Sequence, residues 1–383
     1  METLRHSALR LLTLLMTIGL AEIALGAAQS ATDVSARPCR VVNATQGKHF
    51  PPDLGDALVA AIASANPDDQ LEITGICKGT YTLSQDIVLT GVSTKQFPIP
   101  TLDGAQAGST LTVASGVTAT LTDLTITGGT GAPDPDHLGA PGNGGGIVNR
   151  GNLTLVGCAV SGNRATRNGS GAGIINSGSL TVRGASIVSG NVAENEGGGI
   201  FNSFSGSVTV TESSTVSGNI AGDLGGGIEN IGVFTIDAST VTGNRAGFQG
   251  GAILNFGTLT VQNSSTLNDN RVIFDGGGIF NVGTVTLNSS TLSGNSGSGA
   301  GGAINNHGGI VFLNSSRVSG NESGLGGGVF NNNGTATLNS SVVTGNTAVV
   351  AGGGIYNNAG AVNLNSSTVT ANIPDNCIGV AGC

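Results

Sequence analysis

The sequence predicts an all-β solenoid, in which short strands coil about one axis, and three observations lead to this fold class. A phrase close to Gly-Gly-Gly-Ile-x-Asn recurs nine times, at intervals of 25 to 28 residues, and such a period is typical of stacked coils. Between its copies lie runs of Thr, Val, Leu and Ser in which polar and apolar residues alternate, as they do in strands. The glycine triplets and the β-branched residues exclude helix. The phrase begins at Gly144, Gly171, Gly197, Gly225, Gly250, Gly276, Gly301, Gly326 and Gly352.

One repeat predicts one coil of three strands. Within residues 276–300, three short alternating runs place Ile279, Leu287 and Leu292 on the inward side. Identical positions in successive coils should then lie about 4.8 Å apart, the spacing of neighbouring strands. We therefore expect like residues to stack on like residues and to form narrow aliphatic columns.

Two asparagine positions recur in every repeat. A primary amide carries two donor hydrogens and an acceptor oxygen, so stacked copies can bond to one another and to the backbone at a bend. We expect a structural role for both columns, because a catalytic residue would not recur in all nine coils. The first column is Asn149, Asn176, Asn202, Asn230, Asn255, Asn281, Asn306, Asn331 and Asn357, and the second is Asn163, Asn191, Asn219, Asn244, Asn270, Asn295, Asn321, Asn346 and Asn372.

The N-terminal residues have the pattern of a secretory signal. Arg5 and Arg10 precede an apolar run over 11–20, and small residues follow at 26–28. A retained membrane anchor is the alternative, although the apolar run is short for a span. No later stretch is apolar enough to span a bilayer, so we expect a secreted or surface-held protein with no membrane span in its mature chain.

A short helix is expected to cover the N-terminal end of the solenoid, where an open strand edge would otherwise pair with other chains. Asp53 is the predicted N-cap, and Leu54, Leu58 and Ile62 form one apolar stripe. The predicted segments are a signal peptide over 1–28, a linker over 29–50, the capping helix and first irregular coils over 51–130, an inserted loop over 131–143, nine coils over 144–372 and a C-terminal cap tail over 373–383.

The inserted loop contains Asp134, Asp136 and His137, which are residue types that ligate metals. The neighbouring prolines and glycines favour an ordinary solvated loop instead. We therefore expect no metal and no cofactor.

Five cysteines are consistent with an exported chain. Five cysteines with one left over allow 15 pairings. Proximity in sequence favours Cys39 with Cys77 and Cys377 with Cys383, which leaves Cys158 alone. The net charge of -9 disfavours nucleic acid as a partner.

Several short motifs carry a family resemblance. GGAIL at 250–254, GGAIN at 301–305 and FNNN at 330–333 are similar to the repeats of bacterial polymorphic outer membrane proteins, and the segment 57–83 is similar to the lid and first coil of secreted bacterial relatives. Over roughly residues 51–377 the chain resembles right-handed parallel β-helix repeat proteins of the pectate-lyase-like superfamily. The resemblance implies a right-handed parallel β-helix (β-solenoid) with a short N-terminal capping helix, and it specifies a fold more than a function.

Members of that superfamily include polysaccharide lyases and hydrolases, but the motifs of a polygalacturonase-like site, Asn-Thr-Asp, Asp-Asp on a coil, Gly-His-Gly and Arg-Ile-Lys, do not occur here. We therefore expect no enzyme. The expected function is structural or adhesin-like, with an extracellular glycan or a cell-surface protein as partner, and a polysaccharide lyase or glycoside hydrolase is the alternative.

Charged residues gather in the variable turn between the second asparagine column and the next glycine triplet. Stacking should bring these turns together as one ridge, either as a solvated ridge with ion pairs of alternating sign between coils or as a binding ridge for sugars or ions. The candidate ridge residues are Arg164, Arg167, Glu194, Glu196, Asp223, Arg245, Arg271, Asp275 and Glu322.

Outward threonines suggest a further alternative, ice binding by flat threonine ranks. Threonine is also a favoured residue on any exposed strand, and Phe312, Asn363 and Arg317 interrupt the ranks. The paired threonines are Thr258 and Thr260, Thr284 and Thr286, Thr335 and Thr337, Thr240 and Thr242, and Thr368 and Thr370.

Overall fold

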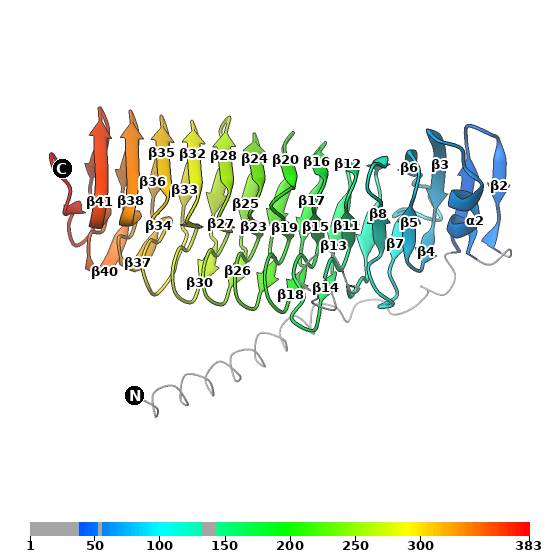
Figure 1. The fold of residues 1–383 in the computed structure, drawn as a ribbon, viewed down its shortest axis with the longest axis horizontal. Coiled ribbons are helices and arrows are strands. Elements are labelled where there is room, and N and C mark those ends of the chain that lie inside the picture. The colour runs from blue at the N-terminus through cyan, green and yellow to red at the C-terminus, as the bar shows by residue number, and fades with distance from the viewer. Residues whose placement is uncertain (1–37, 53–55, 132–142) are drawn as a thin grey trace, which may run out of the picture. The chain divides into compact units, whose positions relative to one another are not determined.

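The structure is a computed structural model that describes residues 38–52, 56–131 and 143–383. Within residues 39–383 the strands stack as a parallel β-solenoid of about eleven turns (Figure 1). This confirms the predicted all-β solenoid. The predicted signal peptide and most of the inserted loop lie outside the described residues. So do the predicted N-cap Asp53, its neighbour Leu54 and the loop's candidate ligands Asp134, Asp136 and His137.

From β11 to β31, each coil starts with a three-residue strand that follows the glycine triplet. These strands pair in parallel and in register, so that Ile147 aligns with Ile174 and Ile174 with Ile200. The first column comprises β5 (Tyr81–Leu83), β8 (Leu111–Val113), β11 (Ile147–Asn149), β15 (Ile174–Asn176), β19 (Ile200–Asn202), β23 (Ile228–Asn230), β27 (Ile253–Asn255), β31 (Ile279–Asn281), β34 (Ile304–His307), β38 (Val329–Asn339) and β41 (Ile355–Asn365).

The second column carries the alternating Thr, Val and Leu runs. In its last two coils the first and second strands are continuous, so β38 and β41 each span 11 residues. Before these, the column comprises β3 (Asp69–Thr74), β6 (Ile87–Gly91), β9 (Thr118–Thr122), β12 (Asn152–Val156), β16 (Ser179–Arg183), β20 (Ser207–Val210), β24 (Val233–Asp237), β28 (Thr258–Gln262), β32 (Thr284–Asn288) and β35 (Ile310–Asn314).

The third column is a separate 12-stranded parallel sheet. Its strands contain the Ser-Thr-Val-Ser run of the repeat, and their central residue points into the core. They are β4 (Ile76–Lys78), β7 (Thr101–Asp103), β10 (Thr125–Thr127), β13 (Ala159–Ser161), β17 (Ile187–Ser189), β21 (Thr215–Ser217), β25 (Thr240–Thr242), β29 (Thr266–Asn268), β33 (Thr291–Ser293), β36 (Arg317–Ser319), β39 (Val342–Thr344) and β42 (Thr368–Thr370).

The variable turn contains a fourth short strand, which the sequence analysis did not predict. Strands of only two residues leave no periodic pattern, so this part of the repeat reads as a turn. The fourth-column strands are β14 (Arg164–Ala165), β18 (Val192–Ala193), β22 (Ile220–Ala221), β26 (Arg245–Ala246) and β30 (Arg271–Val272), and further along β37 (Glu322–Leu325) pairs with β40 (Thr347–Ala351).

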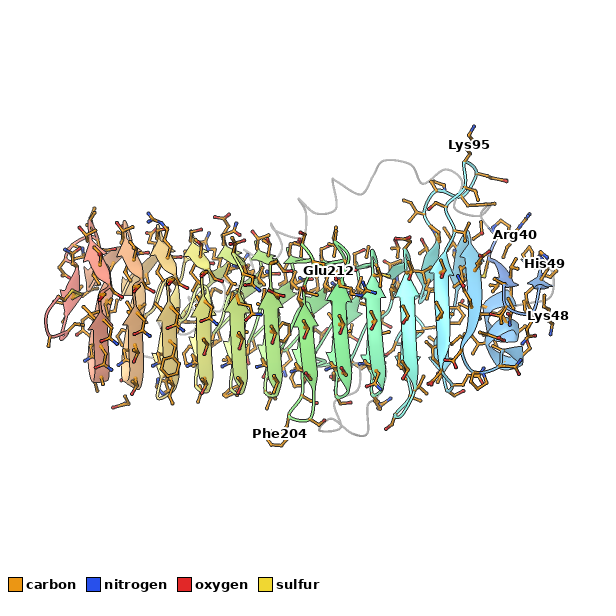
Figure 2. All side chains as sticks on the ribbon, turned by 90° about the horizontal axis from the view of Figure 1, so that it is seen from above. Arg40, Lys48, His49, Lys95, Phe204 and Glu212 are labelled. Atoms are coloured by element: carbon orange, nitrogen blue, oxygen red, sulfur yellow. A yellow bond between two sulfur atoms is a disulfide. The ribbon has the colours of Figure 1, made fainter. Side chains whose placement is uncertain are left out.

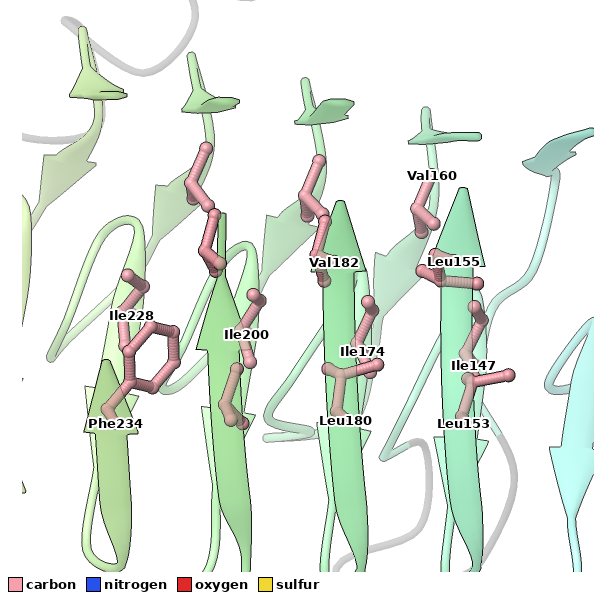
Figure 3. Packing of buried hydrophobic residues seen from close by; sticks show 14 of the residues in the cluster. Ile147, Leu153, Leu155, Val160, Ile174, Leu180, Val182, Ile200, Ile228 and Phe234 are labelled. Atoms are coloured by element: carbon pink, nitrogen blue, oxygen red, sulfur yellow. The ribbon is translucent and has the colours of Figure 1, made fainter. Parts of the chain in front are cut away.

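The interior is a continuous aliphatic core in which like residues stack. Figure 3 shows Ile147, Ile174, Ile200 and Ile228 side by side in successive coils, and each of these side chains is fully buried. Phe234 fills a place that leucine or valine takes in the neighbouring coils. The burial of these columns supplies the main stabilising free energy of the fold, about 1.5–3 kcal/mol for each Val, Leu, Ile or Phe side chain.

Both asparagine columns form continuous ladders of buried amides, as predicted. In the first, Asn149 Nδ2 donates to Asn176 Oδ1 at 2.7 Å. In the second, Asn244 Nδ2 donates to Asn270 Oδ1 at 3.0 Å. Each amide also donates to backbone carbonyls at the bend, so these polar groups are satisfied inside the body of the solenoid.

The glycine that opens each repeat has a positive φ. At Gly225 φ is +60°, and a Cβ there would lie 2.5 Å from the carbonyl oxygen of Ile228. Any L-residue side chain would therefore strain this turn and collide with the strand that follows it.

The N-terminal end is closed by a helix and an antiparallel hairpin. α2 (Ala57–Ser64) begins after Asp56, whose carboxylate accepts hydrogen bonds from the backbone N–H groups of Leu58 and Val59 at 3.1 and 3.2 Å. The N-cap is therefore Asp56 and not Asp53, because the Asp56 carboxylate is the one that reaches the free amides of the first turn. Leu58 is fully buried, as its place on the predicted stripe requires.

The hairpin consists of β1 (Arg40–Asn43) and β2 (Lys48–Phe50), and β1 also pairs antiparallel with β3. A disulfide between Cys39 and Cys77 joins it to the first coil. At the other end β43 (Cys377–Ile378) pairs with the start of β41, and a second disulfide joins Cys377 to Cys383. Both predicted disulfides are confirmed, and Cys158 is free and buried. Among the described residues, no helix is long and apolar enough to cross a membrane.

Candidate functional site

The ridge consists of the turns between each second-column asparagine and the next glycine triplet. Parallel pairing aligns Arg164, Arg245, Arg271 and Glu322 in one rank along the outer side of the fourth strands. All four side chains are exposed. The structure therefore brings these predicted residues together, with Val192, Ile220, Ser296 and Thr347 in the same rank.

A second rank of residues lies further along the same variable turns, directly before the glycine triplets. Isolated bridges align Glu196, Leu224, Gln249 and Asp275. Asp275 Oδ1 accepts a hydrogen bond from the backbone N–H of Ala300 at 2.7 Å. This carboxylate thus supports the turn of the next coil as well as facing the surface.

The remaining predicted residues occupy the N-terminal part of the ridge and its crest. By the crest we mean the residues of each variable turn that lie between the first and the second rank. Arg167 is exposed and has a φ of +56° in the turn after β14. Glu194 is exposed, and its Oε2 accepts from the backbone N–H of Asn168 at 3.0 Å. Asp223 is half-buried on the crest, where its carbonyl oxygen accepts from the N–H of Phe248 at 2.7 Å.

The prediction of alternating ion pairs along the ridge is wrong for the described residues. No salt bridge joins two described ridge residues; an ion pair is found instead between Arg183 and Glu212 (3.6 Å), at the ends of second-column turns. Arg245 and Arg271 lie next to each other in register and carry the same charge. The reason is that equivalent positions of consecutive repeats are stacked on each other. An ion pair therefore forms only where one repeat has a basic residue and the next has an acidic residue at the same position.

Two exposed phenylalanines form a platform on the crest that sequence reasoning missed. Phe248 is 53% exposed and Phe274 is 44% exposed. Their ring centroids lie 4.7 Å apart at an interplanar angle of 39°. We call this pair the aromatic platform. The signal in the sequence is an aromatic residue in two successive variable turns of a chain with only 3% aromatics.

The platform is surrounded by polar groups that can hydrogen bond. Asp223 precedes Phe248 along the crest, Asp275 directly follows Phe274, and Gln249 is aligned with Asp275. Arg245 and Arg271 lie on the adjacent rank. An exposed apolar surface with polar groups at its rim is the usual composition of a binding site.

A buried glutamate near the ridge is the second residue that sequence reasoning missed. Glu229 is the central residue of β23 and is only 3% exposed. Its neighbours in register are Phe201 and Leu254, so a carboxyl group occupies a place in an apolar rank. The sequence does show a glutamate at a repeat position where the other coils have an apolar residue or asparagine. It does not show whether the side chain at this position points toward the solvent or is covered.

Glu229 belongs to a cluster of three carboxyl groups with Glu196 and Asp223. Burial raises the pKa of Glu229 well above its ordinary value, and the nearby Glu196 and Asp223 raise it further. Burial also raises the pKa of Glu196, against which its hydrogen bonds to Glu229 and Ser170 act. Glu229 Oε2 has no hydrogen-bond partner. The pair therefore holds a proton that an exposed glutamate would lose.

The carboxyl cluster does not have the arrangement of a metal centre. Among the described residues, no group of three His, Cys, Asp or Glu side chains has the geometry to hold a metal ion. Two uses of the three carboxyl groups then remain. They can form a protonated contact that stabilises the fold, or they can act as acid and base groups in catalysis, which requires that a substrate reach them.

Outward threonines of the second column form a rank that is longer than predicted. The register aligns seven successive threonines before Phe312 interrupts the rank, and Thr337 and Asn363 follow. The seven are Thr120, Thr154, Thr181, Thr209, Thr235, Thr260 and Thr286.

Comparisons of the chain with protein-family profiles, with curated proteins and with solved structures find no significant match.

Proposed function

We propose that the protein is a secreted, non-catalytic β-solenoid of the structural or adhesin-like kind, which binds an extracellular glycan through its ridge. The observation that carries the proposal is the aromatic platform of Phe248 and Phe274, which leaves large parts of both rings exposed. An aromatic face binds the apolar face of a sugar ring, while planar polar side chains at the rim take up its hydroxyl groups.

Two further features support extracellular work. The two disulfides belong to an oxidising compartment, and the first 28 residues have the pattern of a signal peptide. The solenoid is rigid and repeats every coil, so it presents the ridge as a long binding face. The proposal also includes membership of the pectate-lyase-like β-helix proteins, with repeats similar to those of bacterial polymorphic outer membrane proteins.

Binding should be measured with the purified protein and a panel of immobilised neutral and acidic polysaccharides. We expect Phe248→Ala and Phe274→Ala each to weaken binding at least tenfold, because each removes one of two rings of the platform. Phe204→Ala is the matched control: Phe204 is 86% exposed and protrudes from the edge of the solenoid (Figure 2). Unchanged binding by both platform variants would exclude the ridge as the site.

The carboxyl cluster favours a second candidate function, a polysaccharide lyase or glycoside hydrolase. A glutamate that keeps its proton next to a second carboxylate has the character of an acid–base pair. This candidate predicts new reducing ends or unsaturated products from one of the same polysaccharides. Glu196→Gln and Asp223→Asn should abolish the products and Glu322→Gln should not. Absence of turnover on the whole panel would leave the non-catalytic function.

The threonine rank favours a third candidate, ice binding. Seven hydroxyl-bearing side chains at strand spacing form a regular row on one face. Thermal hysteresis of the purified protein is the measurement. Hysteresis that Thr209→Lys and Thr235→Lys remove would support ice binding, and no hysteresis would exclude it.

A further inference from the structure

Two arginines of the same charge lie side by side on the ridge. Arg245 of β26 is aligned in register with Arg271 of β30 in the next coil (Figure 1). Aligned residues of neighbouring parallel strands are about 4.8 Å apart and point to the same side. Both side chains are exposed. Because like charges directly opposite each other repel, this pair costs stability unless an anion lies between the two guanidinium groups.

No described residue neutralises this pair of arginines. Neither guanidinium makes an ion pair with a described carboxylate. The residues next to the pair in the same rank, Ile220 and Ser296, are uncharged. The acidic side chains of the neighbouring turns are engaged elsewhere: Asp275 is bound to the backbone of the next coil, and Asp223 lies beside Glu229. The positive charge of the pair is therefore available to a ligand.

The same two coils carry the aromatic platform. Phe248 follows Arg245 by three residues, and Phe274 follows Arg271 by three residues. The two rings lie 4.7 Å apart between centroids, so arginine and phenylalanine repeat together from one coil to the next. Three residues span at most about 10 Å of chain, a distance that a short glycan covers. One glycan can therefore contact both rings and both guanidinium groups.

Two adjacent guanidinium groups match a tetrahedral oxyanion better than a carboxylate. A guanidinium donates its hydrogen bonds as a planar fork, and a single fork takes up both oxygens of a carboxylate. A phosphate ester has three terminal oxygens, and a sulfate ester has the same shape, so either group has enough acceptors for two forks. The pair of Arg245 and Arg271 is thus suited to one ester group held between two coils.

We propose that Arg245 and Arg271 together bind a sulfate or phosphate ester of a sugar whose ring lies on the aromatic platform. This role of the arginines rests on the proposed glycan binding by the ridge, and it makes the ligand a glycan with tetrahedral anionic substituents. The net charge of -9 repels polyanions in general. The two arginines therefore decide which anionic glycans bind, and a glycan without the ester binds through the platform alone and more weakly.

The test uses two matched pairs of immobilised polymers: chondroitin sulfate with its chemically desulfated form, and phosphomannan with its dephosphorylated form. Desulfated chondroitin keeps its uronate carboxylates, so the first pair also separates a sulfate from a carboxylate. We expect the purified protein to bind at least one esterified polymer at least tenfold more tightly than the same polymer without the ester. The pair that shows this preference identifies the ester, and no preference in either pair would overturn the proposal.

Variants that keep the charge assign the preference to the two guanidinium forks. The double variant Arg245→Lys, Arg271→Lys keeps both positive charges and lacks the planar forks, so it should lose most of the preference for the ester. Arg317→Lys is the matched control, because Arg317 is exposed on β36, in a different sheet; this variant should bind as wild type does. A preference that the double variant retains would overturn the proposal.

Glycan binding by the ridge can stand without this role of the arginines, and the same experiment separates the two. Binding that Phe248→Ala weakens, but that is equal for the esterified and unesterified polymers, would leave the glycan function in place and overturn the role of the arginines. Binding to none of these polymers, nor to any other polysaccharide of the panel, would overturn both.

Discussion

Glu229 of β23 lies next to the carboxyl group of Glu196 in the preceding coil, and this neighbour adds to the effect of burial in raising the pKa of Glu229. Two neighbouring carboxyl groups repel each other unless one of them is protonated. The apolar neighbours Phe201 and Leu254 keep water away from Glu229 and favour its neutral form. The stability of the middle of the solenoid is therefore linked to pH at this position.

Replacement of Glu229 tests this linkage. The folded pKa of Glu229 lies above the unfolded value near 4.5, so the folded state holds the proton more tightly. The stabilising contribution is full below the unfolded pKa and is lost as pH rises through the folded pKa. Denaturant titrations from pH 4 to pH 8 should show that wild type loses stability relative to Glu229→Gln as pH rises.

Glu229→Leu should go further and stabilise the protein at pH 8 by about 1–3 kcal/mol, because it removes a buried acceptor that lacks a partner. Glu322→Gln serves as the control, since Glu322 is exposed. Parallel stability curves for wild type and Glu229→Gln across this pH range would show that Glu229 is not the linked group.

The second asparagine column is expected to be essential for stability. Asn244 donates to Val216 O at 3.0 Å and to Asn270 Oδ1 at 3.0 Å, and its own Oδ1 accepts from Asn219. Asn244→Ala leaves these buried groups without partners and should cost about 3 kcal/mol of unfolding free energy. Chemical denaturation is the measurement.

The control for this variant is Asn363→Ala. Asn363 is exposed and its amide makes one long contact, 3.4 Å, with Thr337 Oγ1. This change should stay within about 0.5 kcal/mol of wild type. Equal losses for the two variants would argue against a special role for the buried ladder.

The two disulfides should contribute unequally. Cys39 and Cys77 are 38 residues apart, and Cys377 and Cys383 are 6 residues apart. From the entropy of the closed loop, Cys39→Ser should destabilise the fold by about 4 kcal/mol and Cys377→Ser by about 2 kcal/mol. Thermal unfolding of both variants gives the order, and the reverse order would show that loop entropy does not govern this effect.

Cys158 should be unreactive in the folded protein. It is buried, its Sγ lies 3.3 Å from Leu121 O, and burial raises the pKa of its thiol to about 11. Because the thiolate is the reactive form, a thiol-specific chromogenic reagent at pH 8 should detect no thiol before unfolding and one thiol per chain after it. A fast reaction in the native protein would show that the first repeats open readily.

Most of the coil could be predicted from the repeat. The alternation around Ile279, Leu287 and Leu292 placed all three strands correctly at β31, β32 and β33. The N-cap of the helix was predicted too early, at Asp53 instead of Asp56. Both are aspartates, a residue type that commonly caps helices, and only the position of the first free backbone amides identifies the cap.

The surface features were less accessible to sequence reasoning. The contact of Phe248 with Phe274 joins residues one coil apart and depends on how two variable turns of similar length lie on each other. The burial of Glu229 depends on which side of β23 the next turn covers. The expected ion pairs failed because Arg245 is aligned with Arg271 and not with a carboxylate.

The sequence by itself determined the stacking, because identical residues at a fixed period satisfy one another in every coil. Isoleucine packs on isoleucine, asparagine bonds to asparagine, and glycine turns recur above glycine turns. The tertiary structure alone decided what the non-repeating residues do. The aromatic platform and the pair of Glu196 and Glu229 depend on close packing between unlike residues of neighbouring coils, and no periodic pattern encodes such packing.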